Sequence, residues 1–284
     1  MKEQINPCLW FDGKAKEAAT FYCNNFKDSK ITAESPLVTE FEVSGQTITC
    51  LDGGPHNKPN ASISFFYICE MEDEIDNIWN EFVNGGSVLM PLDSYPWSKK
   101  YGWIQDKYGI SWQFSFGKIE EVEQKITPCL MFVGNQYGRA EEAINHYLSI
   151  FKNPKLDGIL RYGKNESPDK EGMVKHAQFG FNGQKFMVTE SAHPHDFSFS
   201  EGVSLMILCE TQEEIDYYWD KLTEGGQESM CGWLKDKFGV SWQVIPAILG
   251  KLMSDPTKAE KAVQAFMEMK KFDIEKLLKA QLER

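Results

Sequence analysis

The chain has 284 residues, of which 42% are hydrophobic and 13% aromatic, so it is long enough for two domains with apolar cores and too apolar for a disordered protein. Its 42 acidic and 30 basic side chains give a formal net charge of −12, which argues against nucleic acid and anionic membranes as partners. The first residues lack a signal-peptide profile, and no apolar run approaches the roughly 18 residues of a membrane span. The seven cysteines are scattered and include no C-x-x-C pair. We therefore expect a cytoplasmic protein with reduced thiols.

The first part of the chain predicts two successive sets of strand, helix and further strands. Short extended runs alternate with apolar residues at helical spacing, and glycine or polar turns separate them. The closing turn, Asp106-Lys107-Tyr108-Gly109, has a structural explanation, because aspartate can bond the turn backbone and glycine accepts a positive φ. In chain order we predict strand 7–11, a helix around 18–26, strands 30–35, 38–43 and 46–51, strand 62–69, a helix at 75–82 and a hairpin that turns at 106–109.

The second part repeats the first. Residues 231–243, CGWLKDKFGVSWQ, match residues 101–113, YGWIQDKYGISWQ, at eight of thirteen positions. The patterns E-I-D-x-x-W and P-C-L-x-F also occur in both halves and in the same order. The chain is therefore two copies of one domain. The predicted parts are domain 1 at 1–118, a charged linker at 118–125, domain 2 at 124–247 and a C-terminal helical tail at 248–284.

The tail carries an apolar stripe at Ala262, Ala265, Phe266 and Met269. We expect the stripe to dock on the second domain. A scaffold in which residues 255–284 recruit a partner is the alternative.

These motifs resemble a bacterial family named PhnB-like, labelled 3-demethylubiquinone-9 3-methyltransferase. It is part of the glyoxalase, bleomycin-resistance and extradiol dioxygenase superfamily, also called vicinal oxygen chelate. The resemblance covers both repeats, and the segment 231–243 is especially characteristic. It implies an α+β fold of tandem duplicated glyoxalase-like domains, each built from two βαβββ modules with a curved, mostly antiparallel sheet around a concave pocket. It also implies pairing of the two domains within one chain, with a homodimer as the alternative.

The resemblance further implies where metal ligands would stand. Metal-dependent members carry a histidine on the fifth strand and a glutamate on the eighth, besides ligands on the first and fourth strands. The fifth-strand position falls here on Ser64 and Ser204, and the eighth-strand position on Gln113 and Gln243. Neutral hydroxyl and amide groups bind divalent metals poorly, so we expect no metal and no other cofactor.

Alternation along the closing strands separates core residues from candidate pocket residues. Trp112 and Trp242 should face the helices, which directs the neighbouring Gln113 and Gln243 toward the pocket. Trp103 and Trp233 share their strand face with Gln105 and Lys235, so they could stack on a flat ligand or simply close the end of the sheet. The second copy adds a strand histidine and a strand-end glutamate. The candidate ligand-binding residues are Trp103, Gln113, His176, Glu190, Trp233 and Gln243.

Two functional hypotheses follow for the pockets. The first is a metal-free protein that binds a small, partly aromatic molecule, as the superfamily's resistance proteins do. The second is an enzyme of the superfamily, a lyase, dioxygenase or methyltransferase, that uses His176, Glu190 and Gln243 as non-standard ligands. The sequence identifies no catalytic residue. The glycine pairs follow helices or lie in a loop, so they do not form the strand-to-helix turn that binds a nucleotide-type methyl donor.

Overall fold

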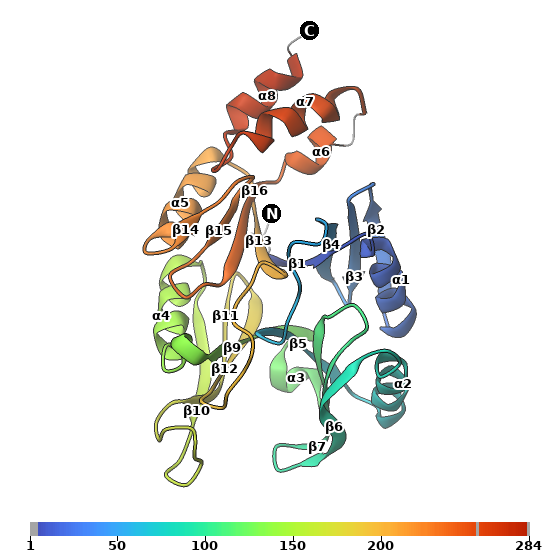
Figure 1. Ribbon diagram of the computed structural model, residues 1–284, viewed down its shortest axis with the longest axis vertical. Helices are drawn as coiled ribbons and strands as arrows, with labels where there is room; N and C mark the ends of the chain where they lie inside the picture. The colour runs from blue at the N-terminus through green and yellow to red at the C-terminus, as the bar shows by residue number, and fades with distance from the viewer. Residues whose placement is uncertain (1–4, 254–255, 283–284) are drawn as a thin grey trace. The chain divides into compact units, whose positions relative to one another are not determined.

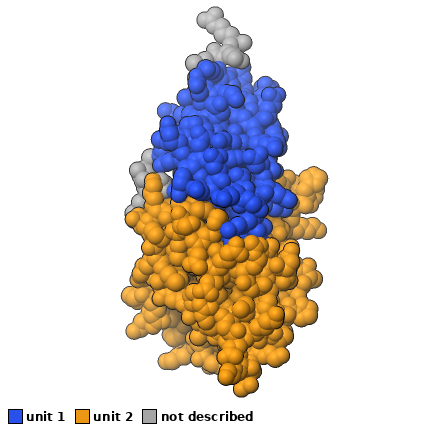
Figure 2. Space-filling model, turned by 90° about the vertical axis from the view of Figure 1, so that its left-hand side faces the viewer, with its two compact units in different colours: residues 1–6, 204–284 blue, residues 7–203 orange. Residues whose placement is uncertain are grey.

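The computed structural model describes residues 5–253 and 256–282, and the chain divides into two compact units (Figure 2). Unit 1 comprises residues 1–6 and 204–284, and unit 2 comprises residues 7–203. The predicted junction between the two copies therefore lies inside unit 2. None of the helices in the described ranges is long and apolar enough to cross a membrane.

Each copy runs strand, helix and three strands, twice over, as the sequence predicted (Figure 1). The first copy contains β1 (Ile5–Phe11), α1 (Ala15–Asn25), β2 (Ser29–Glu34), β3 (Val38–Val43), β4 (Gln46–Asp52), β5 (Ile63–Cys69), α2 (Glu72–Phe82), β6 (Ser87–Tyr95), β7 (Ser98–Gln105) and β8 (Ser111–Phe116). The linker and second copy contain α3 (Ile119–Val122), β9 (Ile126–Val133), η1 (Gly134–Gln136), α4 (Ala140–Ile150), β10 (Lys155–Arg161), β11 (Val174–Phe181), β12 (Gln184–Ser191), β13 (Val203–Cys209), α5 (Gln212–Thr223), β14 (Gln227–Glu228), β15 (Trp233–Lys235) and β16 (Ser241–Pro246). The tail contains α6 (Leu249–Met253), α7 (Pro256–Met267) and α8 (Ile274–Leu282).

Unit 2 contains an eight-stranded sheet in the order β10-β11-β12-β9-β5-β8-β7-β6. Only the β12–β9 and β5–β8 pairs are parallel, so the predicted mostly antiparallel sheet is confirmed. At its centre β5 pairs with β9 in antiparallel register, with Ser64 opposite Cys129. The sheet therefore joins the second module of copy one to the first module of copy two, which the sequence repeat alone did not reveal.

The other modules follow the same plan within their own units. In unit 2, β1 lies parallel to β4, and β3 and β2 continue from β4 in antiparallel order. The β3–β4 hairpin turns at Ser44 and Gly45, both at positive φ, as its tight two-residue loop requires. In unit 1, β13 lies parallel to β16, and the short β15 and β14 follow in antiparallel order.

Aromatic residues on one face of the unit 2 sheet form its core. Trp112 and Phe114 on β8 are fully buried, and the ring of Phe82 on α2 packs edge-on against both. The rings of Tyr22 and Phe26 on α1 also contact Trp112. In unit 1, Trp242 and Val244 on β16 are fully buried. The prediction that Trp112 faces the helices is confirmed, and Trp242 is buried in the same way.

The Asp-Lys-aromatic-Gly turns fix these tryptophans. One oxygen of Asp106 accepts hydrogen bonds from the backbone N–H groups of Tyr108 and Ile110. The other accepts from Trp112 Nε1 at 2.9 Å and from the Tyr22 hydroxyl at 2.7 Å. Asp236 makes the same backbone bonds and accepts from Trp242 Nε1 at 2.9 Å. The structural interpretation of the motif is confirmed, and each aspartate also holds a core indole.

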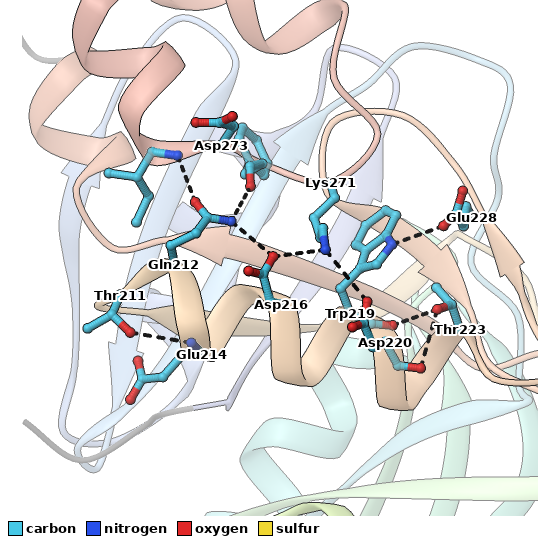
Figure 3. Close-up of polar contacts among 12 residues, drawn as sticks. Thr211, Gln212, Glu214, Asp216, Trp219, Asp220, Thr223, Glu228, Lys271 and Asp273 are labelled. Carbon is cyan, nitrogen blue, oxygen red and sulfur yellow. Dashed lines mark hydrogen bonds and ion pairs between the residues drawn. The ribbon is translucent and has the colours of Figure 1, made fainter.

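The tail docks on the second repeat, as predicted (Figure 3). Gln212 at the start of α5 accepts from Ile274 N and donates to the carbonyl of Phe272. Lys271 pairs with Asp216 on α5 at 2.8 Å. The Phe272 ring is 1% exposed and lies so close to Gly232 that a Cβ there would be 2.6 Å from it.

The predicted linker is part of the packed structure. Its helix α3 places Val122 against the cluster of Ile68, Cys129 and Met187. Lys125 is 8% exposed and pairs at 2.9 Å with Glu74 of α2, which also accepts from the Tyr67 hydroxyl. A charged composition suggested an exposed connection, but this lysine forms a buried ion pair.

Candidate functional site

The face of the unit 2 sheet opposite the aromatic core carries the candidate site. Residues directly opposite one another in the ladders share a face, as do alternate residues along one strand. One face therefore carries residues from β5, β9, β12 and β11, which are paired as Ser64–Cys129, Cys129–Met187 and Met187–Gln178. Strand β8 adds Gln113, which lies opposite Phe66 of β5. We call this surface the polar face and define it by Ser64, Trp103, Gln113, His176 and Gln178.

Gln113 lies in the middle of a hydrogen-bonded chain on the polar face. Its Nε2 donates to Ser64 Oγ at 2.7 Å, and its Oε1 accepts from the Tyr101 hydroxyl at 2.7 Å. These two bonds fix the orientation of the amide. An amide oxygen has two lone pairs, so Gln113 Oε1 keeps one for a ligand, whereas the second N–H is shared with the Cys129 thiol. The side chain is only half-buried.

Trp103 stands beside Gln113, directly opposite it in the β7–β8 ladder. Its Nε1 donates to Ser111 Oγ at 2.8 Å, which fixes the plane of the indole. The ring is half-buried, so part of its surface is open to solvent. The structure thus brings together two of the predicted site residues from neighbouring strands.

His176 shares this face but lies on β11, with the strands β12, β9 and β5 between it and β8. The side chain is half-buried, and desolvation lowers the pKa of its imidazole. The neutral ring is therefore the favoured form at neutral pH, and it can donate one hydrogen bond and accept another.

The centre of the polar face is apolar. Cys129 and Met187 form its floor, and Val122 of α3 packs on them with Phe66 alongside. Burial raises the pKa of the Cys129 thiol to about 12, against smaller opposing hydrogen bonds with Gln113, Thr189 and Ser64. This thiol is therefore protonated at neutral pH, and it is neither a nucleophile nor a metal ligand in that form.

Glu190 does not belong to the polar face. It follows Met187 by three residues on β12, so it points to the opposite side of the sheet from His176. One of its oxygens accepts from Ala140 N at the start of α4, and the other accepts from Val174 N. Asp52 in the first copy likewise accepts from Ala15 N at the start of α1. Glu190 fixes a helix start, and the enzyme trio that includes it is not assembled around His176.

Trp233 and Gln243 form the corresponding pair in unit 1. They are directly opposite each other in the β15–β16 ladder, as Trp103 and Gln113 are in unit 2. Gln243 Nε2 donates to Ser204 Oγ at 2.9 Å, but the side chain is only 6% exposed. The pair is thus repeated in unit 1 with a less accessible glutamine.

The residues at the superfamily's metal positions do not fit a metal. The serine and glutamine at these positions bond directly to each other in both copies, Ser64 with Gln113 and Ser204 with Gln243. Neither group carries the ionised oxygen that a divalent cation prefers. Among the described residues, no three His, Cys, Asp or Glu side chains come together in a metal-binding cluster.

Sequence reasoning missed Tyr101, whose hydroxyl orients Gln113. It is 5% exposed, and its ring contacts Phe66, Tyr95 and Trp97. The alternation that identified Trp103 also places Tyr101 on the same face, two residues earlier on β7, so the signal was present in the strand pattern.

The comparisons with known proteins agree with this fold. The family model described as 3-demethylubiquinone-9 3-methyltransferase matches the chain twice, at residues 3–115 and 124–245. The PhnB protein from Bacillus cereus is 35% identical, and the match covers 40% of this chain and 100% of that chain with a TM-score of 0.39. Glyoxalase I from Zea mays is 13% identical and shares the fold, with 89% of this chain and 97% of that chain covered and a TM-score of 0.53. No curated protein matches the chain.

Proposed function

We propose that the protein binds a small, partly aromatic molecule on the polar face without the superfamily's metal. The chain belongs to the family described as 3-demethylubiquinone-9 3-methyltransferase. The family and the glyoxalase-like fold do not fix the chemistry, because one fold hosts many activities. The residues of the polar face decide it.

The direct bond between Ser64 and Gln113 carries the proposal. Where metal-dependent relatives would hold a cation between a histidine and a glutamate, this chain has a serine and a glutamine that hydrogen-bond each other. A ligand here would be bound by the Gln113 amide, whose Oε1 keeps one lone pair, and by the exposed surface of the Trp103 ring. Sites of this kind, mostly apolar with a few fixed polar groups, suit small organic molecules.

Binding without metal can be tested with 4-bromophenol, an uncharged ring with a hydroxyl group. We expect it to raise the unfolding temperature of the protein in proportion to the logarithm of its concentration, equally with and without a chelator. Gln113→Leu should reduce the shift, because it removes the hydrogen-bonding amide and keeps much of the side-chain volume.

Elemental analysis of protein purified without chelator supplies the decisive control. The proposal predicts less than stoichiometric zinc, iron, manganese and nickel. Stoichiometric metal whose removal abolishes ligand binding would replace the proposal with a metal-dependent site.

A further inference from the structure

A cluster of three aromatic rings occupies the β6–β7 hairpin beside the polar face. The rings of Tyr95 and Trp97 stack with centroids 5.0 Å apart and planes 22° apart. Tyr101 meets both edge-on, at 5.7 Å from Tyr95 and 5.9 Å from Trp97. We call Tyr95, Trp97 and Tyr101 the aromatic hairpin.

Trp97 is exposed although it belongs to a ring cluster. Its side chain is 60% exposed, while Tyr101 beneath it is 5% exposed. Stacking on Tyr95 fixes one side of the indole and leaves much of the remainder open to solvent. A large aromatic surface held rigidly and left exposed is a feature of binding sites, because stacking on it costs little conformational entropy.

The aromatic hairpin is connected to the polar face by direct contacts. Tyr101 donates its hydroxyl proton to Gln113 Oε1 at 2.7 Å, and its ring lies 6.4 Å from that of Phe66. Trp97, Tyr101 and Gln113 are therefore in contact one after another, from the rim of the sheet toward its interior.

The second copy has no equivalent hairpin. The strand pair β14–β15 has only the registered positions Gln227–Lys235 and Glu228–Leu234, whereas β6–β7 extends from Ser87 to Gln105. The two copies share the tryptophan–glutamine pair but differ in this element, so the aromatic hairpin gives unit 2 a recognition feature of its own.

The charged groups around the aromatic hairpin, Lys99 included, are either exposed or paired, which favours an uncharged ligand. The Tyr101 phenol has a pKa raised by burial, so it is neutral. Lys100 is paired with Asp76 of α2. Asp93, opposite Tyr101 in the ladder, is exposed to solvent and accepts from Ser94 N. A charged ligand would find no buried counter-ion among these groups, and the net charge of −12 disfavours an anion.

We propose that the aromatic hairpin selects an uncharged, planar aromatic molecule, which stacks on Trp97 and directs a hydroxyl or carbonyl group to the Gln113 amide. This specificity rests on the proposed function, because it assigns the chemical class of the molecule that the polar face binds.

Calorimetric titration with three naphthalene compounds tests the proposal. They are 2-naphthol, which is uncharged, 2-naphthoate, an anion, and 2-naphthylmethylamine, a cation at neutral pH. The full chain should bind 2-naphthol at least tenfold more tightly than either ion. Trp97→Ala should weaken its binding by roughly threefold to tenfold, the range of one aromatic contact, while Trp97→Phe restores part of the affinity.

Leu37→Ala is the matched control. Leu37 is 61% exposed on another hairpin of unit 2, so its substitution should leave the affinity unchanged. Equal binding of the ions and 2-naphthol, or unchanged affinity in Trp97→Ala, would overturn the proposed specificity while leaving the proposed function intact. If neither 4-bromophenol nor any of the three naphthalene compounds binds, the proposed function itself is wrong.

Discussion

At the scale of single residues, two aspartates of the repeated turn motif hold the two copies' core tryptophans. Asp106 accepts four hydrogen bonds, from two backbone N–H groups, the Trp112 indole and the Tyr22 hydroxyl. Its burial raises the carboxyl pKa, which these bonds oppose. A buried carboxylate is tolerated here because its oxygens are fully engaged.

Asp106→Ala should therefore destabilise the protein strongly. The substitution leaves buried donors unpaired, at about 1–3 kcal/mol each, so we expect a loss of at least 3 kcal/mol in the free energy of unfolding, to order of magnitude. Urea denaturation followed by tryptophan fluorescence measures it. Tyr22→Phe removes one of the four bonds and should cost only about 1 kcal/mol. Similar losses in both variants would contradict this account of the turn.

The cysteines provide a second test at the residue scale. Cys8, Cys50, Cys69, Cys129 and Cys209 are buried, whereas Cys23 and Cys231 are half-exposed. Burial raises the pKa of the Cys50, Cys69 and Cys129 thiols and also of Cys23 and Cys231, so solvent access and not pKa separates the two groups. A thiol reagent such as 5,5′-dithiobis(2-nitrobenzoate) should modify two thiols in the native protein and all seven in denaturant. Rapid native modification of Cys129 would show that the floor of the polar face is open.

The sequence predicted the sheet face of some candidate residues and missed the position of others, for a physical reason. Strand alternation is local, so it correctly separated Gln113 from Trp112. The role of Glu190 depends on Ala140 and Val174, which are distant in the sequence. Its position at a strand end resembled that of a ligand, and only the fold shows that it caps a helix start.

At the scale of elements, the tail shows how a C-terminal segment becomes part of a domain. The backbone N–H groups of Cys231 and Gly232 donate to the carbonyls of Met269 and Lys270. Phe272 then packs over Gly232, whose φ of +78° and missing side chain allow the contact. The apolar periodicity of the tail predicted that it would dock, but the backbone contacts required the structure.

Phe272→Ala should release the tail. Deleting a buried phenylalanine side chain costs about 3–5 kcal/mol, enough to undo the docking of a short segment. Limited trypsin digestion should then cleave the chain near Lys270 and Lys271 faster than in the unmodified protein. Leu278→Ala is a suitable control, because Leu278 is 40% exposed on α8 and its loss should leave the digestion rate nearly unchanged. Protection of the tail in Phe272→Ala would show that other contacts hold it.

Acid should loosen the same contact. The hydrogen bond from Lys271 lowers the pKa of Asp216, so the folded-state value lies below the unfolded value of about 3.9. The pair therefore stabilises docking fully above about pH 4, and this contribution is lost as the pH falls through the folded-state pKa. Both groups are partly exposed, so the effect is small and screened by salt.

Hydrogen exchange of the α8 amides, corrected for the intrinsic rate, measures this loosening between pH 6 and pH 3. Protection should decline below about pH 4 in the unmodified chain. In Asp216→Asn the decline should be smaller, because the titrating group is absent. An unchanged acid response in that variant would assign the effect to other carboxylates, such as Glu228 beside Lys270.

At the scale of the whole molecule, the duplication explains how one chain builds a sheet from two copies. The β5–β9 pairing joins the copies through main-chain hydrogen bonds, and the buried Glu74–Lys125 pair anchors the linker between them. The sequence showed the repeat clearly. It could not show which modules share a sheet, because both copies carry the same strand patterns and pairing between them is a long-range property.

Because both copies are present in one chain, we propose that the protein needs no second chain and is a monomer. Sedimentation equilibrium should give a mass near 32.5 kDa at micromolar concentration. A mass near twice that value would support the homodimer instead.

We propose above that the polar face of the unit 2 sheet binds an organic ligand through Gln113 and needs no metal there. A crystal structure of the 4-bromophenol complex, with anomalous data collected at the bromine edge and at the edges of the common transition metals, tests it most directly. We expect a bromine peak over the polar face, with the phenol oxygen within hydrogen-bond distance of the Gln113 amide, and no metal peak between Ser64 and Gln113. A metal ion at that position, or bromophenol bound only on the far side of the sheet among the core aromatics, would contradict it.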